Sequence, residues 1–161
     1  MQLAIERGDR IAGALHYLRD EYSFDFFLRD DGVLARRGFS TRTSLLIQDL
    51  QLEVGLPGQE VLYAWGLHPY TAWNDGALEV PVAEPGVVRV IAPHDLTAGS
   101  SVELDDRDGW TTTWDPDRGW ARVCSPAGDQ GVAVEVATGV VLRIESGDLR
   151  SVWLRPAVIE D

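Results

Sequence analysis

The sequence VAVEVATGVVLRIESGDLRSVWL, residues 132–154, decides the fold class of this chain. The valines of residues 132–136 stand at every second position, which is the period of a strand with one buried face. The turn sequences ATG (137–139) and SGD (146–148) separate three such runs at hairpin spacing. We therefore predict a C-terminal β-meander of three antiparallel strands with one buried and one solvated face.

Similar short runs, apolar or alternating and bounded by Gly, Pro and Asp, fill the chain from Gln59 onward. The predicted strands are 61–65, 77–82, 87–91, 101–104, 110–114, 120–124, 132–136, 140–144 and 149–154. So many short strands close together indicate an antiparallel sandwich or barrel, and not a parallel sheet with crossover helices.

Residues 1–58 are predicted to form a mixed helix and hairpin portion. Asp9 is expected to cap a helix, because apolar residues follow it at spacings of four, three and four. These apolar residues are Ile11, Leu15, Leu18 and Tyr22. The alternation over residues 22–26 then predicts a strand, and the tight turn at 30–32 leads into a return strand at 33–35.

Residues 43–54 fit two patterns. The apolar residues at positions 50, 52 and 54 alternate as in a strand, whereas those at positions 46, 50 and 54 lie four apart, as in a helix. Gly55 followed by Pro57 is typical of a helix end, so we predict a helix here. The predicted fold is mainly β, an α+β arrangement with one or two short N-terminal helices and an antiparallel sandwich or barrel.

The chain of 161 residues has the length of one domain, so we predict a single domain over 1–161 whose β portion is 59–161. Its one cysteine, Cys124, excludes an internal disulfide, fits a reducing compartment and is interpreted as a small buried apolar residue. The start of the chain lacks a signal-peptide pattern, and no apolar run approaches the ~20 residues that span a bilayer. We expect a cytoplasmic protein.

All fourteen basic residues are arginines, and the absence of lysine excludes P-loop, kinase-type and Schiff-base lysine chemistry. The net charge of −12 is uneven, because residues 1–43 hold seven arginines and seven acidic residues, and residues 44–161 hold seven arginines and nineteen acidic residues. We therefore expect no nucleic-acid partner and no membrane binding, whereas basic proteins or cationic ligands would be attracted. Solubility alone is the simpler explanation of this charge.

Residues 103–120 interleave carboxylates with indoles. Carboxylates this close repel one another unless they are solvated, ion-bound or facing a cationic partner, so we predict a partner-binding patch here. Its predicted residues are Asp105, Asp106, Asp108, Trp110, Trp114, Asp115 and Asp117. The turns in this segment place oxygen donors two apart before a glycine, but Arg107 and Arg118 lie inside them, so we predict Asp-rich hairpin turns and no metal site.

A second candidate site lies in the loop 65–76, which carries two indoles, a phenol and an imidazole. Loops on a rigid β scaffold often carry binding residues, and Trp and Tyr supply large contact areas. The predicted ligand-binding residues are Trp65, His68, Tyr70 and Trp73. The alternative is that Trp65 and Trp73 complete the core at the end of a sheet.

Motifs of catalysis are missing from the sequence: it has no G-x-S-x-G, no glycine-rich dinucleotide loop, no H-E-x-x-H and no Cys-x-x-Cys. We assign no catalytic residue and expect no cofactor. The pair His94-Asp95 keeps an acid/base site open, and Asp95 as a turn cap is the alternative. The arginines at 36, 37 and 42 are interpreted as a solvated hairpin edge or as internal partners for the acidic part.

Three functions remain, and we rank them in this order. The first is an acidic interaction module for a basic protein partner. The second is a small-molecule binder that uses the loop 65–76 at the mouth of a barrel or sandwich. The third is an enzyme whose His and Asp residues come from separate loops. The sequence does not specify the partner, the ligand or the oligomeric state.

Overall fold

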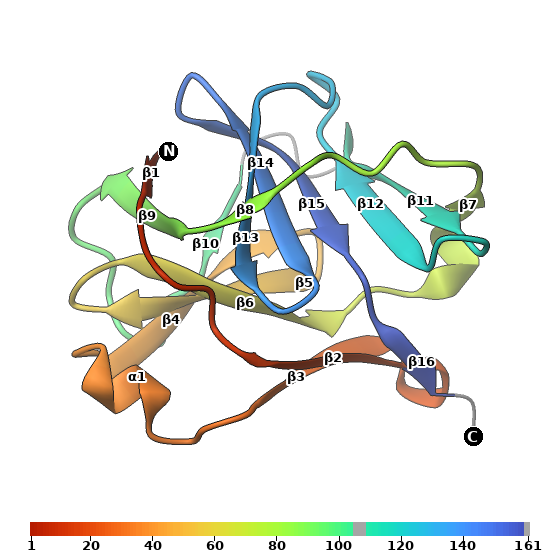
Figure 1. The fold of residues 1–161 in the computed structure, drawn as a ribbon. Helices are drawn as coiled ribbons and strands as arrows, with labels where there is room; N and C mark the ends of the chain where they lie inside the picture. The colour runs from red at the N-terminus through yellow and green to blue at the C-terminus, as the bar shows by residue number, and fades with distance from the viewer. Residues whose placement is uncertain (105–108, 160–161) are drawn as a thin grey trace.

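Two β-sheets make up most of the molecule (Figure 1). The computed structural model describes residues 1–104 and 109–159. The first sheet contains β1 (Gln2–Glu6), β2 (Gly13–Leu18), β3 (Ser23–Leu28), β4 (Thr41–Ile47), β5 (Leu50–Leu56), β6 (Glu60–Leu67), β9 (Val87–Ala92), β10 (Val102–Glu103) and β16 (Ala157–Ile159). The second contains β7 (Asn74–Asp75), β8 (Glu84–Pro85), β11 (Thr111–Asp115), β12 (Trp120–Cys124), β13 (Val132–Ala137), β14 (Val140–Glu145) and β15 (Asp148–Leu154). The fold is mainly β, as predicted, in a sandwich-like arrangement.

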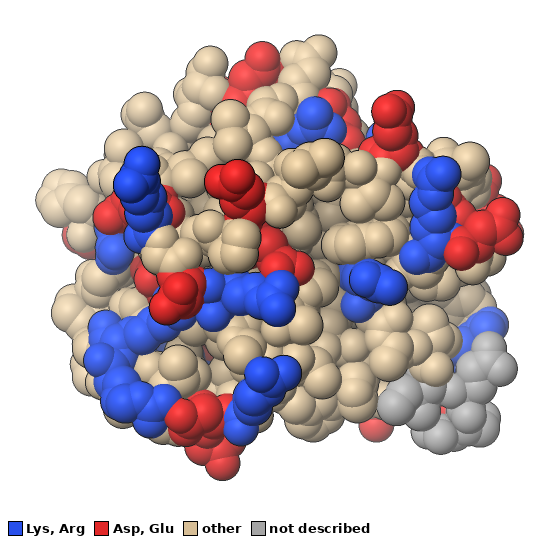
Figure 2. All heavy atoms as spheres, viewed as in Figure 1, with Lys and Arg blue, Asp and Glu red and all other residues tan. Residues whose placement is uncertain are grey.

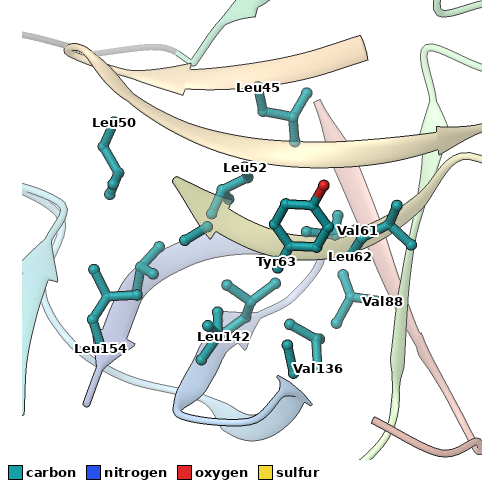
Figure 3. Packing of buried hydrophobic residues seen from close by; sticks show 14 of the residues in the cluster. Leu45, Leu50, Leu52, Val61, Leu62, Tyr63, Val88, Val136, Leu142 and Leu154 are labelled. Atoms are coloured by element: carbon teal, nitrogen blue, oxygen red, sulfur yellow. The ribbon is translucent and has the colours of Figure 1, made fainter. Parts of the chain in front are cut away.

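The core lies between the two sheets and draws side chains from both (Figure 3). Leu45 and Leu52 of the first sheet and Leu142 and Leu154 of the second are fully buried there. One cluster of buried apolar residues runs from Leu3 to Leu154, so it includes residues of both predicted portions, 1–58 and 59–161. The main core of the described chain is therefore shared by both portions, as expected of one domain, and a smaller buried cluster forms around Trp153.

The predicted C-terminal meander is present as β13, β14 and β15, paired antiparallel in sequence order. The turn between β14 and β15 has Ser146 at φ 51° and Gly147 at φ 84°. Two successive left-handed residues are what a two-residue hairpin needs to match the twist of its strands. The turn residues therefore predicted this hairpin correctly, and the pairing of its strands contains a register shift between Arg143 and Ile144.

The second face of the meander was predicted to be solvated, but part of it is covered. Trp153, on that face, is 1% exposed and packs with Val141 under Leu78. Residues 77–82, predicted as a strand, cross this face without joining a sheet. Side chains replace the strand partners: the amide of Leu78 donates to Asp115 Oδ2 at 2.9 Å, and the Arg118 guanidinium donates to the Leu78 carbonyl.

Both predicted N-terminal helices were wrong. Residues 13–18 form β2, in which the alternate residues Leu15 and Tyr17 are buried. The helical spacing of Ile11, Leu15, Leu18 and Tyr22 was a coincidence. Residues 43–54 belong to the hairpin of β4 and β5, whose turn is set by Gln48 at φ 56°. Nothing in the residue type of Gln48 signals a left-handed turn, since Gly and Asn are the usual choices.

Short helical turns are present elsewhere. The structure forms α1 (Val33–Arg36) in place of the return strand predicted at 33–35. Single 3-10 turns at Arg19–Glu21 and Tyr70–Ala72 flank the end of the sandwich described below. No helix of the described residues is long and apolar enough to cross a membrane.

Short parallel strands cover the margins of both sheets. β10 pairs with β4 and β16 with β2 in the first sheet, while β7 pairs with β11 and β8 with β13 in the second. Such short additions limit the backbone that a sheet edge offers to another chain. They also place β16 and β7 at the same end of the sandwich, toward the right of Figure 1.

Candidate functional site

A cleft of about 510 Å³ opens at this end, between the two sheets. We call it the aromatic cleft, and it is lined by Tyr17, Arg19, Tyr70, Trp73, Asp75, Trp114, Pro116 and Val158. Its size falls within the range of pockets that hold small molecules or single side chains.

Each wall of the aromatic cleft is a cross-strand pair at the margin of a sheet. Val158 of β16 lies opposite Tyr17 of β2, and Asp75 of β7 lies opposite Trp114 of β11. Residues directly opposite on neighbouring strands point to the same side of a sheet. The two short marginal strands therefore supply Val158 and Asp75 to the cleft, beside rings from the longer strands.

The floor comes from the loop after β6, and Tyr17 holds that loop in place. The Tyr17 hydroxyl donates to the His68 carbonyl at 2.8 Å and accepts from the Tyr70 amide at 2.9 Å. Burial raises the pKa of Tyr17 to about 12, so the hydroxyl keeps its proton. The His68 amide also donates to the Tyr22 carbonyl at 2.7 Å. These bonds fix the backbone that presents Tyr70 and Trp73.

The rings form a continuous row along the aromatic cleft. Centroid distances are 5.7 Å for Tyr22 and Tyr70, 6.4 Å for Tyr70 and Tyr17, 4.8 Å for Tyr17 and Trp73, and 6.0 Å for Trp73 and Trp114. Tyr22 has φ 54°, an uncommon conformation for a bulky residue, and this places its ring against Tyr70. Packed rings of this kind form a rigid surface.

One cation already lies on this row. The guanidinium carbon of Arg19 is 4.2 Å from the centroid of the Tyr70 ring, within the range of a cation–π interaction. The aromatic surface thus accepts a planar cation in this structure.

Trp73 connects the cleft to the core. It stacks on the buried ring of Phe24 at 5.9 Å, with an interplanar angle of 16°. Its indole Nε1 is buried and has no hydrogen-bond partner among residues 1–104 and 109–159. Buried indole N–H groups usually have a partner, so this one marks a place where an acceptor or a water would be stabilising.

His68, predicted as a ligand-binding residue, lies behind the wall of the aromatic cleft. Its side chain is buried, and Nε2 is 2.6 Å from Thr112 Oγ1 of β11. Burial lowers the pKa of His68 to about 4, so the ring is neutral at pH 7. We interpret His68 as a link between the loop after β6 and the second sheet.

One acidic residue lines the cleft, and other exposed acidic residues are sequence neighbours of lining residues. Asp75 lines the cleft and is exposed, and Asp117, next to Pro116, is exposed as well. Asp20 and Glu21 follow Arg19 directly and are also exposed. Among the described residues within two sequence positions of a lining residue, acidic residues outnumber arginines, and the two arginines are Arg19 and Arg118.

The carboxylate of Asp115 has a structural role. It is 3% exposed and accepts backbone hydrogen bonds from Leu78, Asp117 and Arg118. The bond from the Leu78 amide is the main cause of the lowered pKa of this carboxyl group. Asp115 therefore caps the hairpin of β11 and β12 and holds the segment that covers Trp153.

The structure divides the two predicted sites differently from the sequence. Tyr70 and Trp73 of the predicted ligand-binding loop line the same cleft as Trp114 of the predicted partner-binding patch. Trp110 of that patch is 6% exposed and lies in the core. Trp65 is half-buried outside the cleft lining, and Asp105, Asp106 and Asp108 lie outside the described residues.

Sequence reasoning missed part of the lining, namely Tyr17, Arg19, Asp75, Pro116 and Val158. Asp75 stands within the loop that the sequence singled out, so its charge beside two indoles was an available signal. Pro116 stands in the segment 103–120, which the sequence also singled out, whereas Tyr17 and Val158 meet through the long-range pairing of β2 and β16.

The remaining sequence candidates have separate positions. His94 and Asp95 are exposed, and the described residues contain no group of three or more His, Cys, Asp or Glu side chains that would hold a metal. Burial raises the pKa of the half-buried Cys124 thiol, which disfavours its reactive thiolate.

The arginines around α1 are paired internally. Arg37 contacts Glu60 at 3.1 Å, and Arg42 lies 3.9 Å from Glu53. Both arginines therefore pair with acidic residues of the acidic part of the chain, residues 44–161. Arg36 pairs with Asp30. Figure 2 shows arginines near α1, at the lower left of that view, with acidic side chains among them.

No protein-family model matches this chain, and no curated protein matches it.

Proposed function

We propose that this chain is a binding module for a basic protein partner, and that the partner is engaged at the aromatic cleft. The observation that carries the proposal is a cleft at one end of the sandwich that combines three half-buried rings, Tyr70, Trp73 and Trp114, with the exposed carboxylate of Asp75. Aromatic anchors in a pocket supply binding energy, and complementary charge speeds association and selects the partner.

The net charge of −12 supports the same partner class. A field of this sign attracts cationic surfaces and opposes phosphate backbones. Several arginines of the chain are engaged in ion pairs with its own carboxylates, among them Arg10 with Glu135 and Arg89 with Glu6. We propose a cytoplasmic location on the grounds of the single cysteine and the reducing compartment that it fits.

A neutral small molecule is the second candidate, because the volume of the cleft suits one and Trp73 leaves a buried N–H without a partner among the described residues. We propose no reaction. The described residues that line the cleft include no histidine, cysteine or serine, and His68 lies behind them.

The test uses two synthetic peptides, acetyl-GRGRG-amide and acetyl-GEGEG-amide, with binding followed by indole fluorescence and by the indole N–H signals in NMR spectra. We expect saturable binding of the basic peptide alone, weakened by salt because exposed charges are screened. Trp114→Leu should weaken binding by about tenfold, as loss of an aromatic anchor does. Trp120→Leu, on the outer face, is the matched control and should leave the affinity unchanged. Affinity that is indifferent to salt, or equally reduced in both variants, would contradict the proposal.

A further inference from the structure

We infer that the aromatic cleft selects a guanidinium group, so that the partner presents an arginine side chain and not a lysine. This inference rests on the proposed function and names the chemical group that the cleft receives.

The first support is the contact that Arg19 makes within the chain. Its guanidinium lies 4.2 Å above the Tyr70 ring, and Tyr70 in turn stacks on Tyr22 at an interplanar angle of 20°. A planar delocalised cation stacks on a ring face with little loss of hydration, whereas an ammonium group is compact and strongly hydrated. Tyr70 therefore shows which kind of cation this surface accommodates.

The second support is the open part of the same row. Trp73 and Trp114 line the cleft at a centroid distance of 6.0 Å and an interplanar angle of 45°. Indole is the best of the aromatic rings for a cation–π interaction. Both indoles are half-buried, so part of each ring remains accessible while the remainder is held by packing.

The third support is the position of Asp75. It lies opposite Trp114 in the register of β7 and β11, and both side chains line the cleft. The Gly76 amide donates to the Trp114 carbonyl at 3.0 Å, which fixes β7 against β11 beyond Asp75. A carboxylate beside an indole matches the two requirements of a guanidinium, which are a flat surface for stacking and an acceptor for its forked N–H groups.

Arg19 also predicts the sign of an electrostatic effect. A second guanidinium in the cleft is repelled by Arg19 and attracted by Asp75, so removal of the Arg19 charge should strengthen binding. If the cleft received an anion instead, Arg19 would be its partner and its removal would weaken binding. The response to one substitution therefore separates the two classes of ligand.

The experiment measures dissociation constants of the full chain for three peptides, acetyl-GG-X-GG-amide, in which X is arginine, citrulline or lysine. Citrulline keeps the planar shape of arginine and removes the charge. We expect the citrulline peptide to bind roughly fivefold more weakly than the arginine peptide, which corresponds to the loss of one exposed cation–π contact. We expect the lysine peptide also to bind roughly fivefold more weakly, because its ammonium is strongly hydrated and lacks the planar, forked donors of a guanidinium.

Two pairs of variants complete the test. Arg19→Gln should bind the arginine peptide about threefold more tightly, because like charges separated by less than a Debye length repel. Arg29→Gln is its control, since Arg29 is exposed and lies outside the cleft lining. Asp75→Asn should weaken arginine binding by roughly fivefold and leave citrulline binding unchanged. Asp31→Asn, which removes an exposed carboxylate before α1, is the control for Asp75.

Each outcome has one interpretation. Preference for arginine together with the expected response at Arg19 and Asp75 supports the inference. Equal binding of all three peptides, or weaker binding by Arg19→Gln, overturns the inference. If lysine binds as well as arginine while citrulline does not, the guanidinium preference fails and the proposal of a basic partner stands. Absence of binding by every peptide overturns both.

Discussion

The molecule gathers indoles, arginines and a carboxylate in two places, the aromatic cleft and the outer face of the second sheet. We call the second group the outer cluster, and its members are Trp120, Arg122, Asp129, Arg143, Ser151 and Trp153. Arg122 lies over the Trp153 ring at 5.8 Å, as Arg19 lies over Tyr70 at 4.2 Å. The residue types are similar, and the difference lies in how far their interactions are satisfied within the chain.

In the outer cluster most charged and polar groups interact within the chain, although the buried Nε of Arg122 has no hydrogen-bond partner among the described residues. Asp129 lies 3.6 Å from Arg122 and 3.7 Å from Arg143, and it accepts a hydrogen bond from the Ser151 hydroxyl. The Trp153 indole donates to Ser151 Oγ at 3.1 Å. Leu78 packs against Trp153, which is 1% exposed. Ser151 and Trp153 are thus buried, whereas the other members of the cluster are half-buried.

In the aromatic cleft fewer of the corresponding groups have a partner within the described residues. Asp75 is exposed, the rings of Trp73 and Trp114 are half-buried, and the Trp73 N–H has no partner among the described residues. The comparison teaches that residue type does not distinguish a structural cluster from a binding site. The distinction comes from whether the chain itself supplies the partners of the rings and charges.

The largest expected effect is on stability, and it should differ between the two places. Trp153→Ala removes a fully buried indole and should lower the free energy of unfolding by about 3–5 kcal/mol. Trp114→Ala removes a half-buried ring and should cost about half as much, because the cleft already gives it contact with water. Urea unfolding followed by far-UV circular dichroism measures both. Equal losses would show that the cleft is packed as tightly as the outer cluster.

The second prediction concerns His68, which lies behind the cleft and should make the stability of the fold depend on pH. Since the pKa of His68 is lowered from 6.5 to about 4, the unfolded chain binds a proton between these values and the folded chain does not. The stability that is present above pH 6.5 should therefore decrease as the pH falls to about 4, by about 3 kcal/mol in all.

Substitution isolates the contribution of His68. His68→Gln should be less stable than the wild type at pH 7, and its stability should fall less between pH 6.5 and 4. His94→Gln removes an exposed histidine and is the matched control, with a profile that follows the wild type. Parallel pH profiles for wild type and His68→Gln would contradict the neutral, buried state of this ring. Unfolding curves in urea at half-unit pH steps supply the measurement.

Local patterns in the sequence predicted most of the strands and part of the cleft. Alternation and turn residues identified the meander, because a two-residue turn such as Ser146-Gly147 fixes the register of the strands on both sides. The aromatic residues of the loop 65–76 and the indole at 114 were predicted from their unusual density outside continuous apolar runs. Their half-buried positions agree with that density.

The remainder depends on pairing between distant segments. Val158 and Tyr17 meet across 141 positions of sequence, in a parallel strand of three residues that carries no local signal. The helix predicted at 43–54 was wrong, because apolar residues four apart also lie on the same face of a strand, where side chains alternate every two residues. The hairpin turn between the two strands depends on the left-handed conformation of Gln48, which its residue type does not predict. Leu78 was predicted within a strand, since its side chain alternates correctly, but its backbone partners are the side chains of Asp115 and Arg118.

The smallest effects on stability are expected from removing the carboxylate of each group, Asp129 in the outer cluster and Asp75 in the aromatic cleft. Asp129→Ala leaves Arg122 and Arg143 without this partner and should lower the free energy of unfolding by about 1–2 kcal/mol, because the ion pairs are partly screened by solvent. Asp75→Ala removes an exposed side chain and should change stability by no more than about 0.5 kcal/mol. Thermal unfolding of both variants beside the wild type gives the two values. A loss at Asp75 as large as that at Asp129 would mean that Asp75 serves the fold, and the carboxylate of the cleft would then no longer differ in kind from that of the outer cluster.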